Sequence, residues 1–225
     1  MKHIYVLLIV LIMAIPSISA EQIAPSKIGI VVMHGKGGMP TKHVSDMASA
    51  LEAKGYLVAN LEMPWSKNRE YDVDVESAYK EVESALNGLK SKGAQKLFIA
   101  GHSQGGLFAL STGGRVMCDG IIAIAPGGNV GAPIYKEKVG ESVNDARKLI
   151  EQGKGNEKTT LFDFESSKGK YAITTTPSVY LSWFDPEGAM NQEKVSRKIN
   201  PNIPILFIVP TNDYPGLLKV KQVMF

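Results

Sequence analysis

Short apolar runs alternate with longer amphipathic stretches along the first half of the chain. The run 28–33 reads Ile-Gly-Ile-Val-Val-Met, and its β-branched residues show no alternation of apolar and polar positions. That pattern is typical of a strand buried on both faces, as in a parallel sheet. A helical periodicity follows at 44–54. The alternation continues with predicted strands at 56–61, 96–100 and 120–125 and predicted helices at 73–92 and 106–115.

Strands that alternate with helices of ten or more residues indicate right-handed βαβ crossovers, with helices on both faces of the sheet. The pattern therefore predicts an α/β fold, a three-layer α/β/α sandwich with a mostly parallel sheet. A last buried strand is predicted at 204–209.

The region at about 127–202 is either a cap or a set of helices that cross the sheet. It contains predicted helices at 142–152 and 192–198 and an extended stretch at 174–177. Its aromatic residues could form a pocket wall or an ordinary core; they are Tyr180, Trp183 and Phe184. Earlier in the chain, residues 64–71 could line a pocket mouth, although loop packing is the simpler interpretation.

The first twenty residues differ from the rest of the chain. Lys2 precedes an unbroken apolar run at 4–15, Pro16 ends that run, and residues 18–20 (Ile-Ser-Ala) offer a small-residue cleavage site. The run is shorter than the roughly 20 apolar residues that cross a bilayer. We expect a signal peptide at 1–20, export to the periplasm or the medium, and a mature domain at 21–225 with no stable membrane span.

The composition is that of a globular protein. Hydrophobic residues make up 44% and charged residues 21%, which excludes the disordered and coiled-coil classes. Lys and Arg number 25 against 22 Asp and Glu, and no basic run is present that could follow a phosphate backbone. We therefore expect no nucleic-acid partner. Cys118 is the only cysteine, so no internal disulfide can form.

A glycine-rich segment, Gly-His-Ser-Gln-Gly-Gly at 101–106, lies between the predicted strand 96–100 and the predicted helix 106–115. A serine on a sharp strand-to-helix turn exposes its hydroxyl at the carboxyl end of the sheet, and small neighbours prevent collisions with the strand and helix. The helix N-terminus would stabilise a developing oxyanion. Ser103 is the predicted nucleophile, although a plain glycine-rich turn would explain the pentapeptide alone.

Together with Met-His-Gly-Lys-Gly-Gly at 33–38, this motif resembles the α/β-hydrolase superfamily, and the similarity of layout extends over residues 28 to about 215. The resemblance implies Ser103 as the nucleophile and an oxyanion hole made by the main-chain N–H groups of Lys36 and Gln104. It implies no metal and no organic cofactor.

A phosphate-binding loop is the competing interpretation of residues 35–38. Pro40 occupies the third glycine position of a dinucleotide motif, however, and the G-K-[ST] sequence of a Walker-type loop is missing. The sequence therefore favours the oxyanion loop.

The triad acid of the superfamily usually follows the strand after the cap region. Asp213 lies just past the predicted strand 204–209 and is the predicted acid. Asp185 is a weaker candidate, because an Asp before a proline more often forms a turn.

A histidine base is missing from its expected place. The order in the superfamily is Ser, then Asp or Glu, then His, and no histidine follows Asp213. We expect His34 to be structural and His102 to point away from the site, and His43 is the remaining substitute. The pattern also predicts a terminal helix at 217–225 and a chain that is truncated before a final strand and a His-bearing loop.

Two hypotheses remain open. The first is an exported serine hydrolase that acts on a carboxylic ester or related acyl bond of a small-molecule or lipid-like substrate, and that is inactive as given if the base is absent. The second is a non-catalytic binding protein that keeps the hydrolase scaffold and pocket. In either case no Lys or Pro interrupts residues 205–209, so we expect this edge strand to favour self-association.

Overall fold

Five parallel strands form one sheet, in the order β2-β1-β3-β4-β7, in the part of the chain that the structure describes. The structure is a computed structural model that describes residues 23–42 and 44–212. The sheet confirms the predicted α/β fold with a mostly parallel sheet. Its strands are β1 (Ile28–Met33), β2 (Leu57–Leu61), β3 (Lys96–His102), β4 (Gly120–Ile124) and β7 (Ile205–Ile208).

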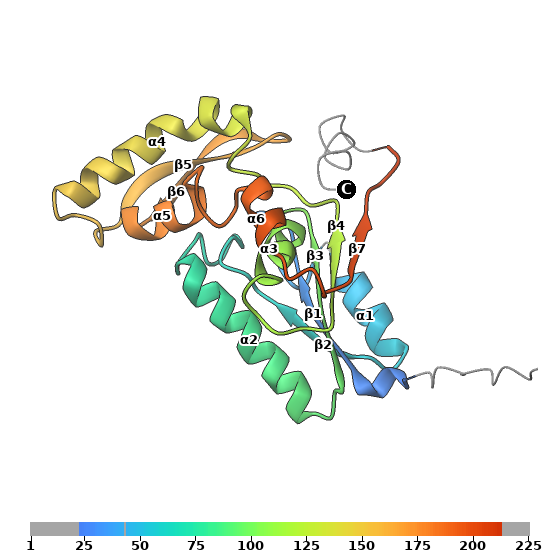
Figure 1. Cartoon of the computed structure of the whole chain (residues 1–225). Coiled ribbons are helices and arrows are strands. Elements are labelled where there is room, and N and C mark those ends of the chain that lie inside the picture. The colour runs from blue at the N-terminus through green and yellow to red at the C-terminus, as the bar shows by residue number, and fades with distance from the viewer. Residues whose placement is uncertain (1–22, 43, 213–225) are drawn as a thin grey trace, which may run out of the picture.

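Alternate side chains of β1 enter two different apolar cores, which explains its uninterrupted apolar sequence. Val31 and Met33 belong to the larger core, with α2 (Val75–Ser91) and α3 (Gln104–Thr112). Ile30 and Val32 belong to a smaller core on the other face. That face carries α1 (Ser45–Ala53), so helices cover both sides of the sheet (Figure 1).

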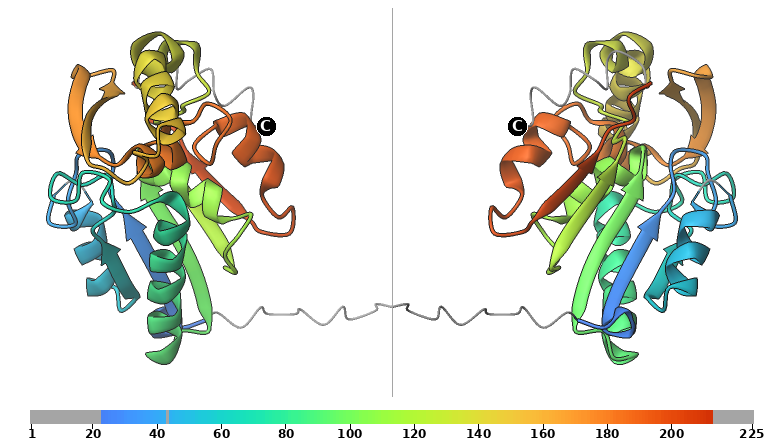
Figure 2. Two further views of the ribbon diagram at one scale, coloured as in Figure 1. Left: turned by 90° about the vertical axis from the view of Figure 1, so that its left-hand side faces the viewer. Right: turned by 90° about the vertical axis from the view of Figure 1, so that its right-hand side faces the viewer.

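A cap lies between β4 and β7 in the chain. It consists of α4 (Pro133–Glu151), the antiparallel pair β5 (Thr159–Glu165) and β6 (Gly169–Thr175), and α5 (Pro177–Phe184). These elements stand beyond the carboxyl ends of the parallel strands (Figures 1 and 2). The short helix α6 (Gln192–Lys198) then packs on α3 and returns the chain to the sheet.

The cap differs from the predicted elements in two ways. Helix α4 begins nine residues before the predicted 142–152, because Pro133 occupies its first turn, where a missing N–H costs nothing. The β5–β6 pair was predicted only as an extended stretch at 174–177. The three aromatic residues of α5 are almost fully buried and are core residues; they are Tyr180, Trp183 and Phe184.

Several sequence predictions lie outside the described residues. They are the signal peptide at 1–20, the substitute base His43, the acid Asp213 and the helix at 217–225. Within the described ranges no helix is both long enough and apolar enough to cross a membrane.

Strand β7 pairs with β4 on one side and is the last strand of the sheet as described. Two of its side chains are exposed, Leu206 at 56% and Ile208 at 40%. Self-association through this strand stays a prediction.

Candidate active site

Ser103 forms the whole turn between β3 and α3. The strand continues to His102 and the helix begins at Gln104, so both elements are closer to the serine than the sequence predicted. Ser103 has φ 54° and ψ −119°, a left-handed conformation that costs about 1–3 kcal/mol for a residue with a side chain. Its N–H donates to the carbonyl of Ile124 on the neighbouring strand at 2.9 Å. The surrounding sheet and helix thus hold the serine in a strained, fixed position.

The glycines around Ser103 allow this turn to be so tight. A Cβ atom on Gly101 would lie 2.1 Å from the carbonyl oxygen of Gly105. A Cβ on Gly105 would lie 2.6 Å from the carbonyl oxygens of Met33 and His34. All of these neighbours are backbone atoms, which cannot rotate away as a side chain can. The glycine positions of the motif are therefore required by the close approach of β1, β3 and α3.

The loop after β1 lies directly against the serine. A Cβ on Gly35 would come within 3.1 Å of the Ser103 Cβ, and Lys36 is the next residue. Gln104 is buried at the first position of α3. The structure therefore brings together Ser103 and both predicted oxyanion-hole residues.

These three residues line one cavity of about 430 Å³, a volume typical of small-molecule sites. The backbone also approaches the hydroxyl closely, since a Cβ on Gly127 would lie 3.4 Å from Ser103 Oγ. The wall is mixed: its larger apolar residues are Ile134, Tyr135 and Phe164, and its polar residues include Asn129, Glu165, Ser166, Ser167 and Gln192.

The described histidines differ in role. His34 is fully buried, and its Nε2 accepts a hydrogen bond from the Met63 N–H at 3.0 Å. Its Nδ1 therefore carries the proton, which it donates to the carbonyl of Gly35 at 2.8 Å. His34 is thus used to hold the loop after β1. His102 is among the residues that line the cavity.

Asp185 lies away from Ser103 and the cavity lining. Its carboxylate pairs with Arg147 at 3.2 Å and accepts the Glu187 N–H at 2.9 Å. This is the geometry of a turn, so Asp185 has a local structural role.

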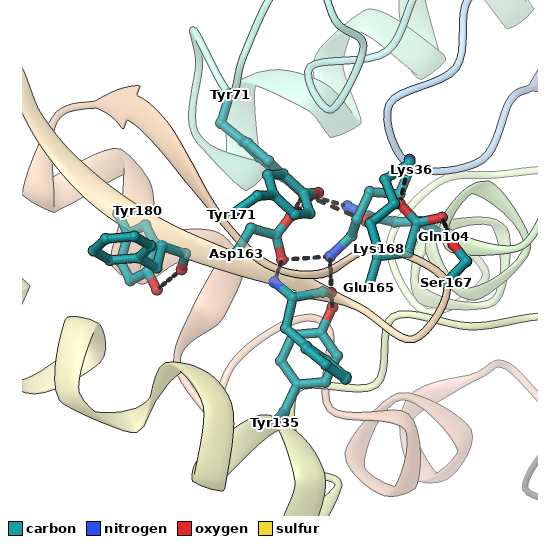
Figure 3. A network of polar contacts seen from close by, with 12 residues as sticks. Lys36, Tyr71, Gln104, Tyr135, Asp163, Glu165, Ser167, Lys168, Tyr171 and Tyr180 are labelled. Carbon is teal, nitrogen blue, oxygen red and sulfur yellow. Dashed lines mark hydrogen bonds and ion pairs between the residues drawn. The ribbon is translucent and has the colours of Figure 1, made fainter.

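A buried ion pair joins the Lys36 side chain to the cap (Figure 3). Lys36 Nζ donates to Asp163 Oδ1 at 2.6 Å, to the carbonyl of Phe164 at 3.2 Å and to the hydroxyl of Tyr135. The Lys36 side chain is 7% exposed and that of Asp163 is fully buried. Because an unpaired charge would be costly at this depth, each group requires the other.

Two tyrosines also donate hydrogen bonds to Asp163. The hydroxyl of Tyr71 donates to Asp163 Oδ2 at 3.0 Å, and that of Tyr171 donates to the same oxygen at 2.8 Å. Burial raises the pKa of Tyr71 well above its usual value, and the negative charge of Asp163 raises it further. The same two causes raise the pKa of Tyr171. Both phenols thus remain protonated donors.

The raised pKa of Tyr71 predicts a pH-dependent stability. At pH 8 the phenol is protonated in both states, so Tyr71→Phe should lower the free energy of unfolding by about 1–3 kcal/mol through its lost hydrogen bonds. At pH 11 the unfolded phenol ionises and the native one does not, which costs the wild type about 1.4 kcal/mol but not the variant. In urea unfolding, the difference in free energy of unfolding between the wild type and the variant should be smaller at pH 11 than at pH 8. An equal difference at both pH values would contradict a raised pKa of Tyr71.

No motif in the sequence pointed to Asp163 and its partners in the cap. One signal was available: in the strand Thr159–Glu165, Asp163 falls two residues after Leu161 and therefore on the same face. A carboxylate on the buried face of a strand requires a cation or several donors. No spacing in the sequence, however, indicates that Lys36 is that cation.

Among residues 23–42 and 44–212, no group of three or more His, Cys, Asp or Glu side chains is placed to hold a metal ion. Neither a protein-family model nor the sequence of a curated protein matches the chain.

Solved structures that resemble it include those of a lipase and an esterase. A monoacylglycerol lipase of Paleococcus ferrophilus has a TM-score of 0.61 at 19% identity, over 90% of this chain and 80% of that one. A thermostable carboxyl esterase of Bacillus coagulans has a TM-score of 0.58 at 16% identity, over 87% of this chain and 77% of that one. At such low identity the likeness establishes the architecture, and it agrees with the strand order and with the turn at Ser103: the chain has the α/β-hydrolase fold.

Proposed function

We propose that this protein is a serine hydrolase that cleaves a carboxylic ester or a related acyl bond, with Ser103 as the nucleophile. The observation that carries the proposal is the strained turn at Ser103, set at a cavity between the loop after β1 and the N-terminus of α3. A strained backbone at a cavity is characteristic of functional residues. The lipase and the carboxyl esterase that share the fold support the choice of an ester.

In the proposed reaction, Ser103 Oγ attacks the carbonyl carbon of the ester. The carbonyl oxygen becomes an oxyanion, and the main-chain N–H groups of Lys36 and Gln104 stabilise it. The C–O bond to the alcohol then breaks, the alcohol leaves with a proton, and water hydrolyses the acyl-serine. A general base takes the proton of Ser103 Oγ and returns it to the departing alcohol.

The cavity favours a substrate of modest size. Its volume of about 430 Å³ lies in the lower part of the range for small-molecule sites. Apolar wall residues such as Ile134 and Phe164 suit a short acyl chain, and Asn129, Glu165 and Gln192 offer polar partners. A short, partly polar ester fits this lining best.

A non-catalytic binding protein is the second candidate. The observation that favours it is the mixed apolar and polar lining of the cavity, which suits a bound small molecule whether or not Ser103 reacts. Such a protein would keep the cavity and bind an ester or acid without turning it over.

Labelling with a fluorophosphonate and hydrolysis of p-nitrophenyl butyrate would separate the two candidates. A hydrolase should be labelled at Ser103, and Ser103→Ala should remove both the label and the turnover. Ser91→Ala is the control, because Ser91 is exposed at the end of α2 and bonds only to Asn87. Turnover that survives in Ser103→Ala would contradict the proposal, whereas butyrate binding without label or turnover would support the second candidate.

A further inference from the structure

We infer that Lys36 and Asp163 form a positioning pair, through which the cap fixes the geometry of the oxyanion hole. This inference rests on the proposed function, because it concerns the side-chain contacts of Lys36 and Gln104, the two proposed oxyanion donors.

Lys36 is the only residue with a side chain in the Gly-Lys-Gly-Gly run at 35–38. Gly37 has φ +62°, and glycines leave a loop conformationally free unless other contacts hold it. The main chain has three such contacts: the Gly35 carbonyl accepts from His34 Nδ1, the Gly37 N–H donates to the carbonyl of Trp65, and the Gly38 N–H donates to that of Gly35. Beyond these, it is the Lys36 side chain that joins the run to the cap.

The Lys36 ammonium is used fully as an anchor. Its three protons have three acceptors, on Asp163, Phe164 and Tyr135. The first two belong to β5 and the third to α4. The Tyr135 hydroxyl in turn donates to the carbonyl of Phe164 at 2.8 Å, which closes the cluster. An ammonium with no remaining donor is unsuited to bind a substrate anion, although it stands beside the cavity.

The second oxyanion residue is connected to the same carboxylate. The Gln104 side chain lies 3.3 Å from the Tyr71 hydroxyl, to which its Nε2 donates, and that hydroxyl donates to Asp163. Asp163 Oδ1 also accepts its own neighbour's N–H, from Phe164, at 2.6 Å. The carboxylate therefore has four donors, and two of the routes lead to the residues whose N–H groups form the proposed hole (Figure 3).

The Lys36–Asp163 pair should affect the rate of the reaction through the position of the two N–H groups. Oxyanion stabilisation depends on N–H groups that are already in place, and removal of one donor costs about 10²–10³ in rate. A displacement of 1 Å can cost about 10². A cap that releases Lys36 would therefore slow attack by Ser103.

The double variant Lys36→Met/Asp163→Asn tests the inference, because it removes both charges and leaves neither one uncompensated. Amide hydrogen exchange in residues 34–38 should become at least about tenfold faster. The limiting rate of Ser103 labelling by a fluorophosphonate should fall about 10- to 100-fold. The half-saturating concentration of the reagent should change less than about threefold, because most of the residues that line the cavity do not bond to Lys36. Lys170→Met is the control: Lys170 lies on the same hairpin, and its pair with Glu141 is at 4.0 Å and exposed.

Each outcome decides the inference. Unchanged exchange at 34–38 would overturn it, and so would faster exchange with an unchanged labelling rate. If the wild type takes no label at Ser103, the proposed function fails, and exchange alone decides whether the pair holds the loop. If the double variant does not fold, Tyr71→Phe replaces it; that variant keeps the ion pair and removes the link to Gln104, so labelling should slow by about three- to tenfold.

Discussion

Alanine at Gly101 is expected to remove Ser103 labelling and to lower the free energy of unfolding by more than about 4 kcal/mol. The added Cβ would lie 2.1 Å from the carbonyl oxygen of Gly105, 2.2 Å from its carbonyl carbon and 2.7 Å from the nitrogen of Gly106. Relief of that clash requires β3 and α3 to separate, and Ser103 is the single residue between them. Urea unfolding and fluorophosphonate labelling of the variant would measure both effects.

Gly88 provides the matched control for this substitution. It lies inside α2, and a Cβ at that position would have no atom within 4 Å. Alanine is the better helix former, so Gly88→Ala should raise stability by about 0.5–1 kcal/mol and leave labelling unchanged. A Gly101→Ala protein that matches the wild type within about 1 kcal/mol and still takes the label would show that the turn tolerates a side chain.

The second large effect is expected from Lys36→Met alone. The variant leaves the fully buried Asp163 carboxylate without its cation, and breaking a buried pair on one side costs about 3–5 kcal/mol. Adding Asp163→Asn should restore much of that stability, because no buried charge is then uncompensated. Unfolding midpoints and urea dependence of the single and double variants would measure the difference.

The exposed pair between Arg197 and Glu193 is the control for the buried one. The two side chains are 76% and 69% exposed, and surface pairs of this kind contribute about 0.5 kcal/mol or less. Arg197→Met should therefore change the free energy of unfolding very little. If Lys36→Met cost no more than this control, the Lys36–Asp163 contact would have to be open to water and could not hold the cap.

The two substitutions act on different parts of the site, and so their effects should be distinguishable. Gly101→Ala changes the position of the nucleophile, and no second substitution in the cap can correct it. Lys36→Met changes the electrostatic balance behind the oxyanion loop, and its stability loss can be reversed by removing the opposite charge. Labelling should remain slow in the reversed protein if the pair has the positioning role inferred above.

The sequence by itself determined the parts of this protein that depend on near neighbours in the chain. The apolar run at 28–33 predicts a strand buried on both faces because each of its five side chains faces one of two cores. The segment at 101–106 predicts a tight turn with a serine, since only glycine fits where two backbones approach so closely. The alternation of such runs with helices was enough to predict the α/β sandwich.

Only the tertiary structure decided which side chains hold the oxyanion loop at 35–38. Lys36 and Asp163 are 127 residues apart, and no periodicity connects them. The sequence predicted a role for Lys36 through its backbone alone, and no motif in it pointed to the cap. The carboxylate of Asp163 can be buried because Lys36, Tyr71 and Tyr171 arrive from three separate segments. Local patterns reflect which side chains leave water, whereas the partner of a buried charge is set by the packing of the whole chain.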